Sequence, residues 1–238
     1  MFQGVAVRAD GLSLRGAHGW VYRDVVVAAE PGSLTAVTGQ AGSGRTSLLL
    51  TLAGRMNPTG GTLTVGRYGR PRGIRRVAAL GLLDGVNDLE KALSVGEHLR
   101  ERSPGLRWGG RQRSQAGHAL ALAGLEPSPD DRTLIRDLGR EQRVRLGIAL
   151  ALLDEPGLLV LDNVEAGLTG DRLEALWATL RDLGDLGLTV IASCTESGLT
   201  PAVHLPGPDT VGTPSAMGAA VPAEKAKTAK TAKKEGDR

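Results

Sequence analysis

The chain has 238 residues, of which 41% are apolar, 23% charged and 3% aromatic. These proportions are typical of a folded globular protein and exclude wholesale disorder. The net charge of +3 is mild, and no apolar run approaches the roughly 18 residues needed to cross a bilayer. The single cysteine, Cys194, excludes an intrachain disulfide. No signal peptide is recognisable, so we expect a protein of the reducing cytoplasm.

The composition changes near residue 206. Of the six lysines, only Lys91 precedes residue 225, and residues 224–238 carry six basic side chains against three acidic ones. Prolines recur among small residues from Pro206 onward, a composition that cannot bury enough apolar surface to offset its ordering entropy. We therefore predict a folded domain over residues 1–205 and a flexible Pro/Ala/Lys-rich tail over residues 206–238.

Along the body, short apolar stretches bounded by turn residues alternate with helical patterns. The segments with strand character are 25–29, 34–38, 62–65, 77–80, 158–162, 189–193 and a short final 203–205. The segments with helical spacing are 45–53, several pieces of 94–153 separated by Gly and Pro, and 171–183. This order predicts an α/β fold with an inserted helical block.

A phosphate-binding loop is indicated between the strand at 34–38 and the helix at 45–53, where the chain reads LTAVTGQAGSGRTSLLL. Gly39 and Gly44 have the spacing of the motif G-x-x-x-x-G-K-[ST], in which backbone N–H groups face phosphate oxygens. Thr46 occupies the place of the hydroxyl that ligates Mg²⁺. The residues expected to hold phosphate are Gly39, Gln40, Ala41, Gly42, Ser43, Gly44, Arg45, Thr46 and Ser47.

One residue of this loop departs from the motif, because Arg45 stands where the lysine is expected. A guanidinium is longer, planar and forked, so it cannot take the place of an ammonium without displacing the loop or pointing away. We expect nucleotide binding to survive this change more readily than tuned catalysis.

A second motif identifies the family that the chain resembles. Residues 158–169, LLVLDNVEAGLT, are similar to the Walker B strand and its continuation, LLLLDEPTAGLD, in ATP-binding domains of ABC transporters. The resemblance extends over residues 4–205. It implies a P-loop NTPase fold of ABC type, with a parallel-sheet core, an N-terminal antiparallel β part and a helical subdomain over about 84–150. It also implies ATP and Mg²⁺ as ligands, with Thr46 and Asp162 as the magnesium-supporting residues.

A nearby DEP sequence, Asp154 to Pro156, is expected to be a connecting turn, because it precedes the strand that Asp162 follows. The catalytic positions implied by the resemblance are substituted. Asn163 replaces the glutamate that follows the Walker B aspartate, and Thr195 aligns with the switch histidine. An amide cannot accept the proton of the attacking water, so both positions are expected to be poorly competent.

Three further family positions also differ. Residues 78–92 contain no glutamine, so only Asp84 or Asn87 could substitute loosely for the glutamine that contacts magnesium. Thr169 replaces the aspartate of the following loop. The signature LSGGQ, which contacts the phosphate held by the opposite subunit, aligns with Arg136, Asp137, Leu138, Gly139 and Arg140. Only Gly139 is kept, and Asp137 would place like charges together. For base stacking, Trp20 or Tyr22 precedes the loop.

The resemblance and its departures together predict an ATP-binding subunit of an ABC-type transporter assembly, with slow or absent hydrolysis of its own. The alternative is a catalytically active ATPase subunit of a divergent transporter. Both imply a membrane-spanning partner subunit, a homodimer or a heterodimer with another ABC ATPase, and a peripheral position at the inner face of the membrane. The arginines at 67–76 and the tail lysines lack interleaved aromatics apart from Tyr68, so no nucleic-acid partner is expected.

Overall fold

The computed structural model describes residues 1–102, 109–195 and 201–207. The expected tail lies outside the described residues from position 208 onward and stays a prediction. The strands are β1 (Val7–Gly16), β2 (Gly19–Ala29), β3 (Leu34–Thr38), β4 (Gly60–Val65), β5 (Ala78–Leu80), β6 (Leu158–Leu161), β7 (Thr189–Cys194) and β8 (Ala202–His204). The α-helices are α1 (Arg45–Leu52), α2 (Pro71–Ile74), α3 (Val95–Arg102), α4 (Gly110–Leu122), α5 (Arg140–Leu152) and α6 (Asp171–Asp185).

Five strands form a parallel sheet in the order β5-β6-β7-β3-β8. Its strands are apolar on both faces, as expected for a parallel sheet covered on both sides. Within β6, Leu158 and Val160 face one core cluster, whereas Leu159 and Leu161 face the other. Because all five strands run in the same direction, their carboxyl ends meet at one edge, and we call this the carboxyl edge.

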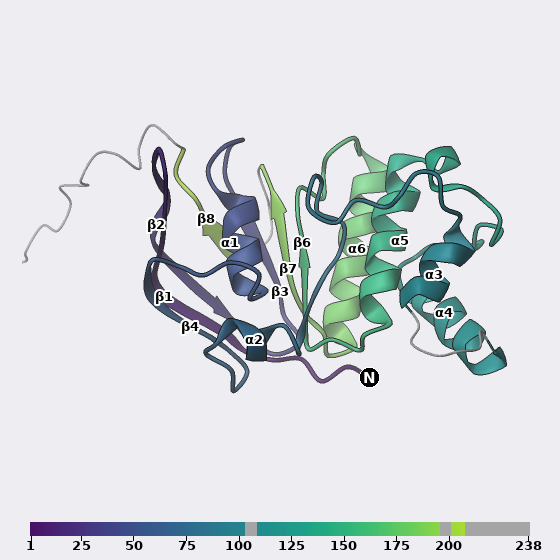
Figure 1. The fold of residues 1–238 in the computed structure, drawn as a ribbon, viewed down its shortest axis with the longest axis horizontal. Coiled ribbons are helices and arrows are strands. Elements are labelled where there is room, and N and C mark those ends of the chain that lie inside the picture. The colour runs from purple at the N-terminus through teal and green to yellow at the C-terminus, as the bar shows by residue number, and fades with distance from the viewer. Residues whose placement is uncertain (103–108, 196–200, 208–238) are drawn as a thin grey trace, which may run out of the picture.

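One face of the parallel sheet is covered by α1 and by an antiparallel sheet of order β2-β1-β4 (Figure 1). Leu48, Leu49 and Leu52 of α1 are fully buried between the two sheets. Tyr22 of β2 is also buried there, and its hydroxyl lies 2.7 Å from Oγ1 of Thr51. These contacts hold β2 against the helix that begins at the carboxyl edge.

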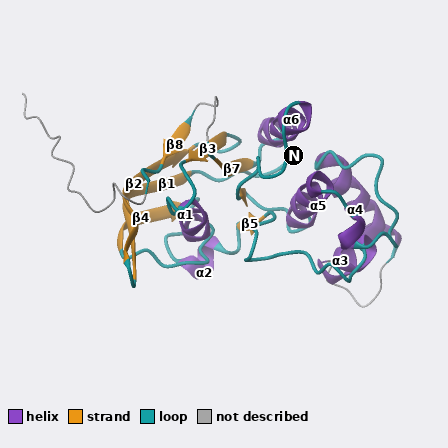
Figure 2. Cartoon of the chain, turned by 90° about the horizontal axis from the view of Figure 1, so that it is seen from above, coloured by secondary structure: helices purple, strands orange, loops and turns teal. Residues whose placement is uncertain are grey.

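The other face is covered by α5 and α6, and α3 and α4 lie farther out beside α5 (Figures 1 and 2). Every residue of α5 from Val144 to Leu152 is buried. Arg145 is the charged residue of this stretch, and it donates to Glu141, to the carbonyl oxygen of Ala123 and to Thr179. Buried polar groups need such partners, so Arg145 ties α5 to both neighbouring helices.

The expected fold class is confirmed: a parallel-sheet core, an antiparallel part near the N-terminus and a group of helices between β5 and β6. The sequence patterns predict no strand at β1. In this strand, Gly11 in a left-handed conformation (φ 58°) and shifts of register interrupt the alternation of apolar and polar residues. The stretch Asp154–Pro156 is a turn between α5 and β6, as expected. In the part of the chain that the structure describes, no helix combines the length and the apolar character needed to span a membrane.

Candidate phosphate-binding site

The predicted phosphate loop lies at the carboxyl edge, between the end of β3 and the start of α1. Gly44 has φ 87°, a left-handed conformation that glycine adopts readily. A Cβ atom on Gly44 would lie 2.4 Å from the carbonyl oxygen of Val21, so β2 closes directly over the loop. A Cβ atom on Gly39 would lie 2.6 Å from Oγ of Ser43 and 2.8 Å from the carbonyl oxygen of Leu205. The loop is therefore tightly wrapped, and glycine is required at both ends.

The loop contains two buried polar atoms without a partner among the described residues. They are Oγ of Ser43 and Nη1 of Arg45. The first turn of α1 has no acidic residue, and Gly44 provides no side-chain cap. A helix N-terminus with free N–H groups, a guanidinium and a hydroxyl forms a site for an anion. The residues at 39–47 thus fit a polyphosphate, with Arg45 at the sequence position of the lysine.

Beside the loop, Thr46 and Asp162 form a second feature. Oγ1 of Thr46 donates to Oδ2 of Asp162 at 2.5 Å, although the two residues are 116 positions apart in sequence. Asp162 follows β6, and its other oxygen accepts a hydrogen bond from Ser193 at the end of β7. A hydroxyl and a carboxylate are the oxygen ligands that Mg²⁺ prefers, so this pair fits a magnesium ion next to the phosphates. Ser193 was not identified from the sequence.

Asn163 has a structural reason for its residue type. Its backbone is left-handed (φ 48°), and asparagine tolerates this conformation better than most residues. The Asn163 N–H donates to Oγ of Ser193 at 2.8 Å. Its side chain is an amide at the position where the family has a carboxylate, so it can orient water but cannot accept its proton.

Thr195 lies at the end of β7 and joins the loop through its backbone. Its carbonyl oxygen accepts a hydrogen bond from Gly39 N–H at 3.3 Å. Its own N–H donates to Oε1 of Glu165 at 2.5 Å. Glu165 was not singled out from the sequence, because only the fold brings it to a residue 30 positions away.

The signature region, Arg136 to Arg140, leads into α5, whose first residue is Arg140. Gly139 is the N-cap residue of α5, and its N–H donates to Oε1 of Gln142. Leu138 is buried, whereas the side chain of Asp137 is 62% exposed. Arg140 binds Asp84 with two hydrogen bonds, at 2.7 and 2.8 Å. Its Nε also donates to the carbonyl oxygen of Ala166, so this guanidinium is occupied within the chain.

Two residues, Asp84 and Asn87, could substitute loosely for the missing glutamine, and both side chains form hydrogen bonds within the chain. Asp84 holds Arg140, as described above. The Asn87 side chain accepts from Leu83 N–H at 2.8 Å and donates to the carbonyl oxygen of Gly81 at 2.7 Å. Neither side chain is therefore free to approach a magnesium ion unless it leaves these partners.

Of the two candidates for base stacking, Trp20 is the accessible one. It precedes Val21, which covers Gly44, and 37% of its surface is exposed. The guanidinium carbons of Arg15 and Arg23 lie 5.6 and 5.3 Å from the centre of its ring. Tyr22, in contrast, is buried, and this burial raises the pKa of its hydroxyl above the ordinary value.

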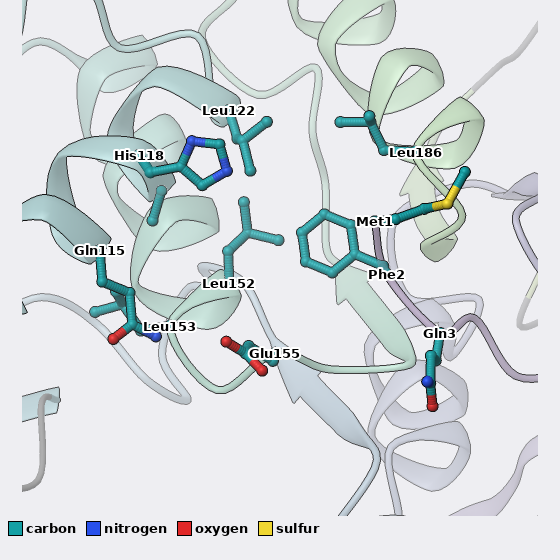
Figure 3. A pocket seen from close by; sticks show the side chains of 11 residues that line it. Met1, Phe2, Gln3, Gln115, His118, Leu122, Leu152, Leu153, Glu155 and Leu186 are labelled. Atoms are coloured by element: carbon teal, nitrogen blue, oxygen red, sulfur yellow. The ribbon is translucent and has the colours of Figure 1, made fainter.

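A cavity of about 600 Å³ lies elsewhere in the molecule, between α4, the turn that leads into β6 and the N-terminal residues (Figure 3). Its lining includes Phe2, His118 and Glu155. Glu155 precedes β6, whereas Asp162 follows this strand, so the cavity and the phosphate loop lie at opposite ends of the sheet.

Comparisons with known proteins agree with this geometry. A family model described as ABC transporter matches residues 22–166. The phosphonates import ATP-binding protein PhnC 2 of Rhodopseudomonas palustris is 30% identical over 212 residues, which cover 83% of this chain and 73% of that protein. The ribose import ATP-binding protein RbsA 1 of Rhizobium johnstonii is 29% identical over 195 residues, with 77% of this chain and 37% of that protein covered.

Among solved structures, cbiO1 from Clostridium perfringens, part of the transporter complex cbiONQ, superimposes with a TM-score of 0.71. The match covers 84% of this chain and 85% of that chain at 20% sequence identity, so the likeness is one of fold. The chain spans only 37% and 32% of the lengths of two ribose import relatives.

Proposed function

We propose a function from one premise: the chain belongs to the ABC transporter family. It acts as an ATP-binding subunit of a transporter assembly, binding Mg-ATP at a degenerate site with slow or absent hydrolysis of its own. The nucleotide-binding domain extends over residues 1–205, with a helical insert near 84–150. The observation that carries the proposal is the pairing of Thr46 with Asp162 beside a glycine loop, whose buried donors have no partner among the described residues.

In this proposal each group of residues at the site has a separate role. Backbone N–H groups of the loop and the Arg45 guanidinium hold the phosphates. The Thr46 hydroxyl and the Asp162 carboxylate hold Mg²⁺, which supplies charge neutralisation at the phosphates. Trp20 offers its ring to the base. Ser193 fixes the orientation of the Asp162 carboxylate through a hydrogen bond.

Slow or absent hydrolysis follows from the groups beyond Asp162. The amide side chain of Asn163 cannot accept a proton. The side chain of Thr195 is shorter than the imidazole of the histidine that it replaces. The signature region offers little to the phosphate of a second subunit, because Asp137 would repel it and Arg140 is held by Asp84. Each of these groups would lower the rate of the chemical step without preventing binding.

The alternative, an active ATPase subunit of a divergent transporter, is favoured by one observation. The Thr46–Asp162 pair has the residue types needed for the magnesium ion, and a positioned water is activated in part by the phosphate itself. In either case we propose that membrane-spanning subunits and a second ABC ATPase, identical or different, complete the assembly at the inner face of the membrane. Two of the relatives are named for the import of phosphonates and of ribose, and these cargoes belong to those proteins.

The first experiment is calorimetric titration of the purified chain with ATP and Mg²⁺. We expect saturable binding that weakens strongly in Asp162→Ala, because this variant removes the carboxylate that holds the metal. ATP with a chelator in place of Mg²⁺ is the matched control. Absence of binding to the wild-type chain at millimolar nucleotide would mean that Arg45 spoils the loop and would overturn the proposal.

Turnover separates the two candidate activities. Asn163→Glu restores an acid at the family position, and a gain in ATP turnover would indicate a site that lacks only this group. No change would indicate a deeper loss. A wild-type turnover near the general range for enzymes, roughly 1 per second or more, that disappears in Asp162→Ala would favour the active alternative.

A further inference from the structure

Glu165 places a carboxylate at the carboxyl edge, near Asn163, which carries an amide where the family has a carboxylate. It lies three residues after Asp162 and two after Asn163, in a half-buried turn. Its Oε1 accepts a hydrogen bond from Thr195 N–H at 2.5 Å. Its Oε2 has no partner among the described residues. One oxygen is therefore held by the backbone of Thr195.

A short series of hydrogen bonds links this carboxylate to the phosphate loop. Thr195 receives the hydrogen bond from Gly39 N–H through its carbonyl oxygen and gives its own N–H to Glu165. Gly39 is the first residue of the loop. The carboxylate is thus held one residue away from the loop backbone, on the side where Thr195 follows β7.

Two other acids at this edge, Asp162 and Asp84, are engaged within the chain. Both oxygens of Asp162 accept hydrogen bonds, from Thr46 and from Ser193. Both oxygens of Asp84 bind Arg140. In the turn at 163–170, which reads NVEAGLTG, Glu165 is the single acidic residue. Within this turn, Glu165 is therefore the side chain that could accept a proton.

We propose that Glu165 is the proton acceptor for residual hydrolysis at this site, in place of the acid that Asn163 lacks. This inference rests on the proposed nucleotide site. In the step, the water oxygen forms a bond to the terminal phosphorus, and the bond between that phosphorus and the bridging oxygen breaks. The water proton passes to Oε2 of Glu165 and then to the released phosphate, so ADP and phosphate leave and the carboxylate is restored.

The variant Glu165→Gln separates proton transfer from positioning. The glutamine Oε1 can still accept the Thr195 N–H, but the side chain cannot accept a proton. We expect turnover to fall by about 100-fold, the lower end of the usual contribution of a general base. Mg-ATP affinity by calorimetry and hydrogen-exchange protection of the Thr195 amide without nucleotide should both stay within twofold of wild type.

Two companion variants complete the test. Glu165→Ala removes the acceptor as well, so Thr195 protection should fall, and added formate should restore part of the turnover. Asn163→Glu placed in the Glu165→Gln background should also raise turnover, because an acid returns to the neighbouring position. Asp162→Ala gives the background rate.

The outcomes are distinct. Wild-type turnover in Glu165→Gln would overturn the inference, as would equal losses of turnover, affinity and Thr195 protection, which would indicate a structural role only. Mg-ATP binding without turnover above the Asp162→Ala background would overturn the inference and leave the proposed function standing. Absence of Mg-ATP binding would overturn both.

Discussion

Gly44 allows the shape of the loop to be tested at a single residue. Gly44→Ala would place a non-glycine residue at φ 87° and a methyl group 2.4 Å from the backbone oxygen of Val21. Strain and overpacking together should lower the free energy of unfolding by about 2–4 kcal/mol, measured by urea denaturation. Mg-ATP binding should also be lost, because the N–H groups at the start of α1 must move.

The control is Gly85→Ala. Gly85 also has a left-handed backbone (φ 74°), but an added Cβ would meet nothing within 4 Å. This variant should lose only the conformational term, about 1 kcal/mol, and should keep nucleotide binding. Equal destabilisation in both variants would contradict the role assigned to the Val21 contact.

The contacts between residues also show which parts of the site could be predicted from the sequence. The place of the loop between β3 and α1 could be predicted, because it lies in a contiguous motif with a strand before it, whereas the role of Asp162 was implied by the family resemblance. Glu165 on Thr195 and Arg140 on Asp84 could not be predicted, because these partners are 30 and 56 positions apart. Only the packing of strand ends and of α5 brings them together.

At the scale of elements, the pair formed by Arg140 and Asp84 joins the start of α5 to the loop after β5. Their double-mutant cycle should give a coupling of about 0.5–1 kcal/mol, at the upper end for exposed pairs because the contact is bidentate. Since 52% of the Asp84 side chain is exposed, added salt should reduce this coupling. Urea unfolding of the single and double alanine variants measures it.

Arg136 and Asp137 form the control pair for that cycle. Their closest atoms are 3.9 Å apart and both side chains are more than 60% exposed, so their coupling should be close to zero. A coupling for Arg140 and Asp84 that is equally small would mean that the pair does not hold α5 against the loop.

The stability of the start of α3 should depend on pH. Ser94 donates to Oε2 of Glu97 through both its N–H and its hydroxyl, at 2.7 Å each. The backbone hydrogen bond from Ser94 is the main cause that lowers the pKa of Glu97 below its ordinary value. The stabilisation is therefore present above the ordinary glutamate pKa and is lost as the pH falls through the lowered folded-state pKa.

Hydrogen exchange of the α3 amides across acidic pH tests this cap, with carboxyl NMR of Glu97 to follow its titration. Protection, corrected for intrinsic exchange, should fall as Glu97 gains a proton. In Glu97→Gln the acid-dependent part should disappear, because no titrating cap is left. The same pH dependence in both proteins would contradict the prediction.

For the whole molecule, the sequence order of strands and helices was enough to predict an α/β fold but not the order of strands in the sheet. β3 pairs with β7 on one side and with β8 on the other, so the phosphate loop emerges from the interior of the sheet. Within β3, Ala36 faces one core cluster and Val37 faces the other, so the strand that leads into the loop is held on both faces. The carboxyl edge therefore joins residues from β3 with residues from β6 and β7, which lie more than 100 positions later in the chain.

This convergence predicts that nucleotide stabilises the entire fold. A ligand that binds only the folded state at 100 times its Kd raises the free energy of unfolding by about 2.7 kcal/mol. Mg-ATP at that ratio should do so in urea denaturation of the wild-type chain. ATP with a chelator should give a smaller gain, and Asp162→Ala should give almost none, because Thr46 then has no carboxylate beside it with which to hold Mg²⁺. A full gain without Mg²⁺ would mean that the loop and Arg45 alone carry the affinity, and that the pairing of Thr46 with Asp162 is a structural contact between α1 and β6.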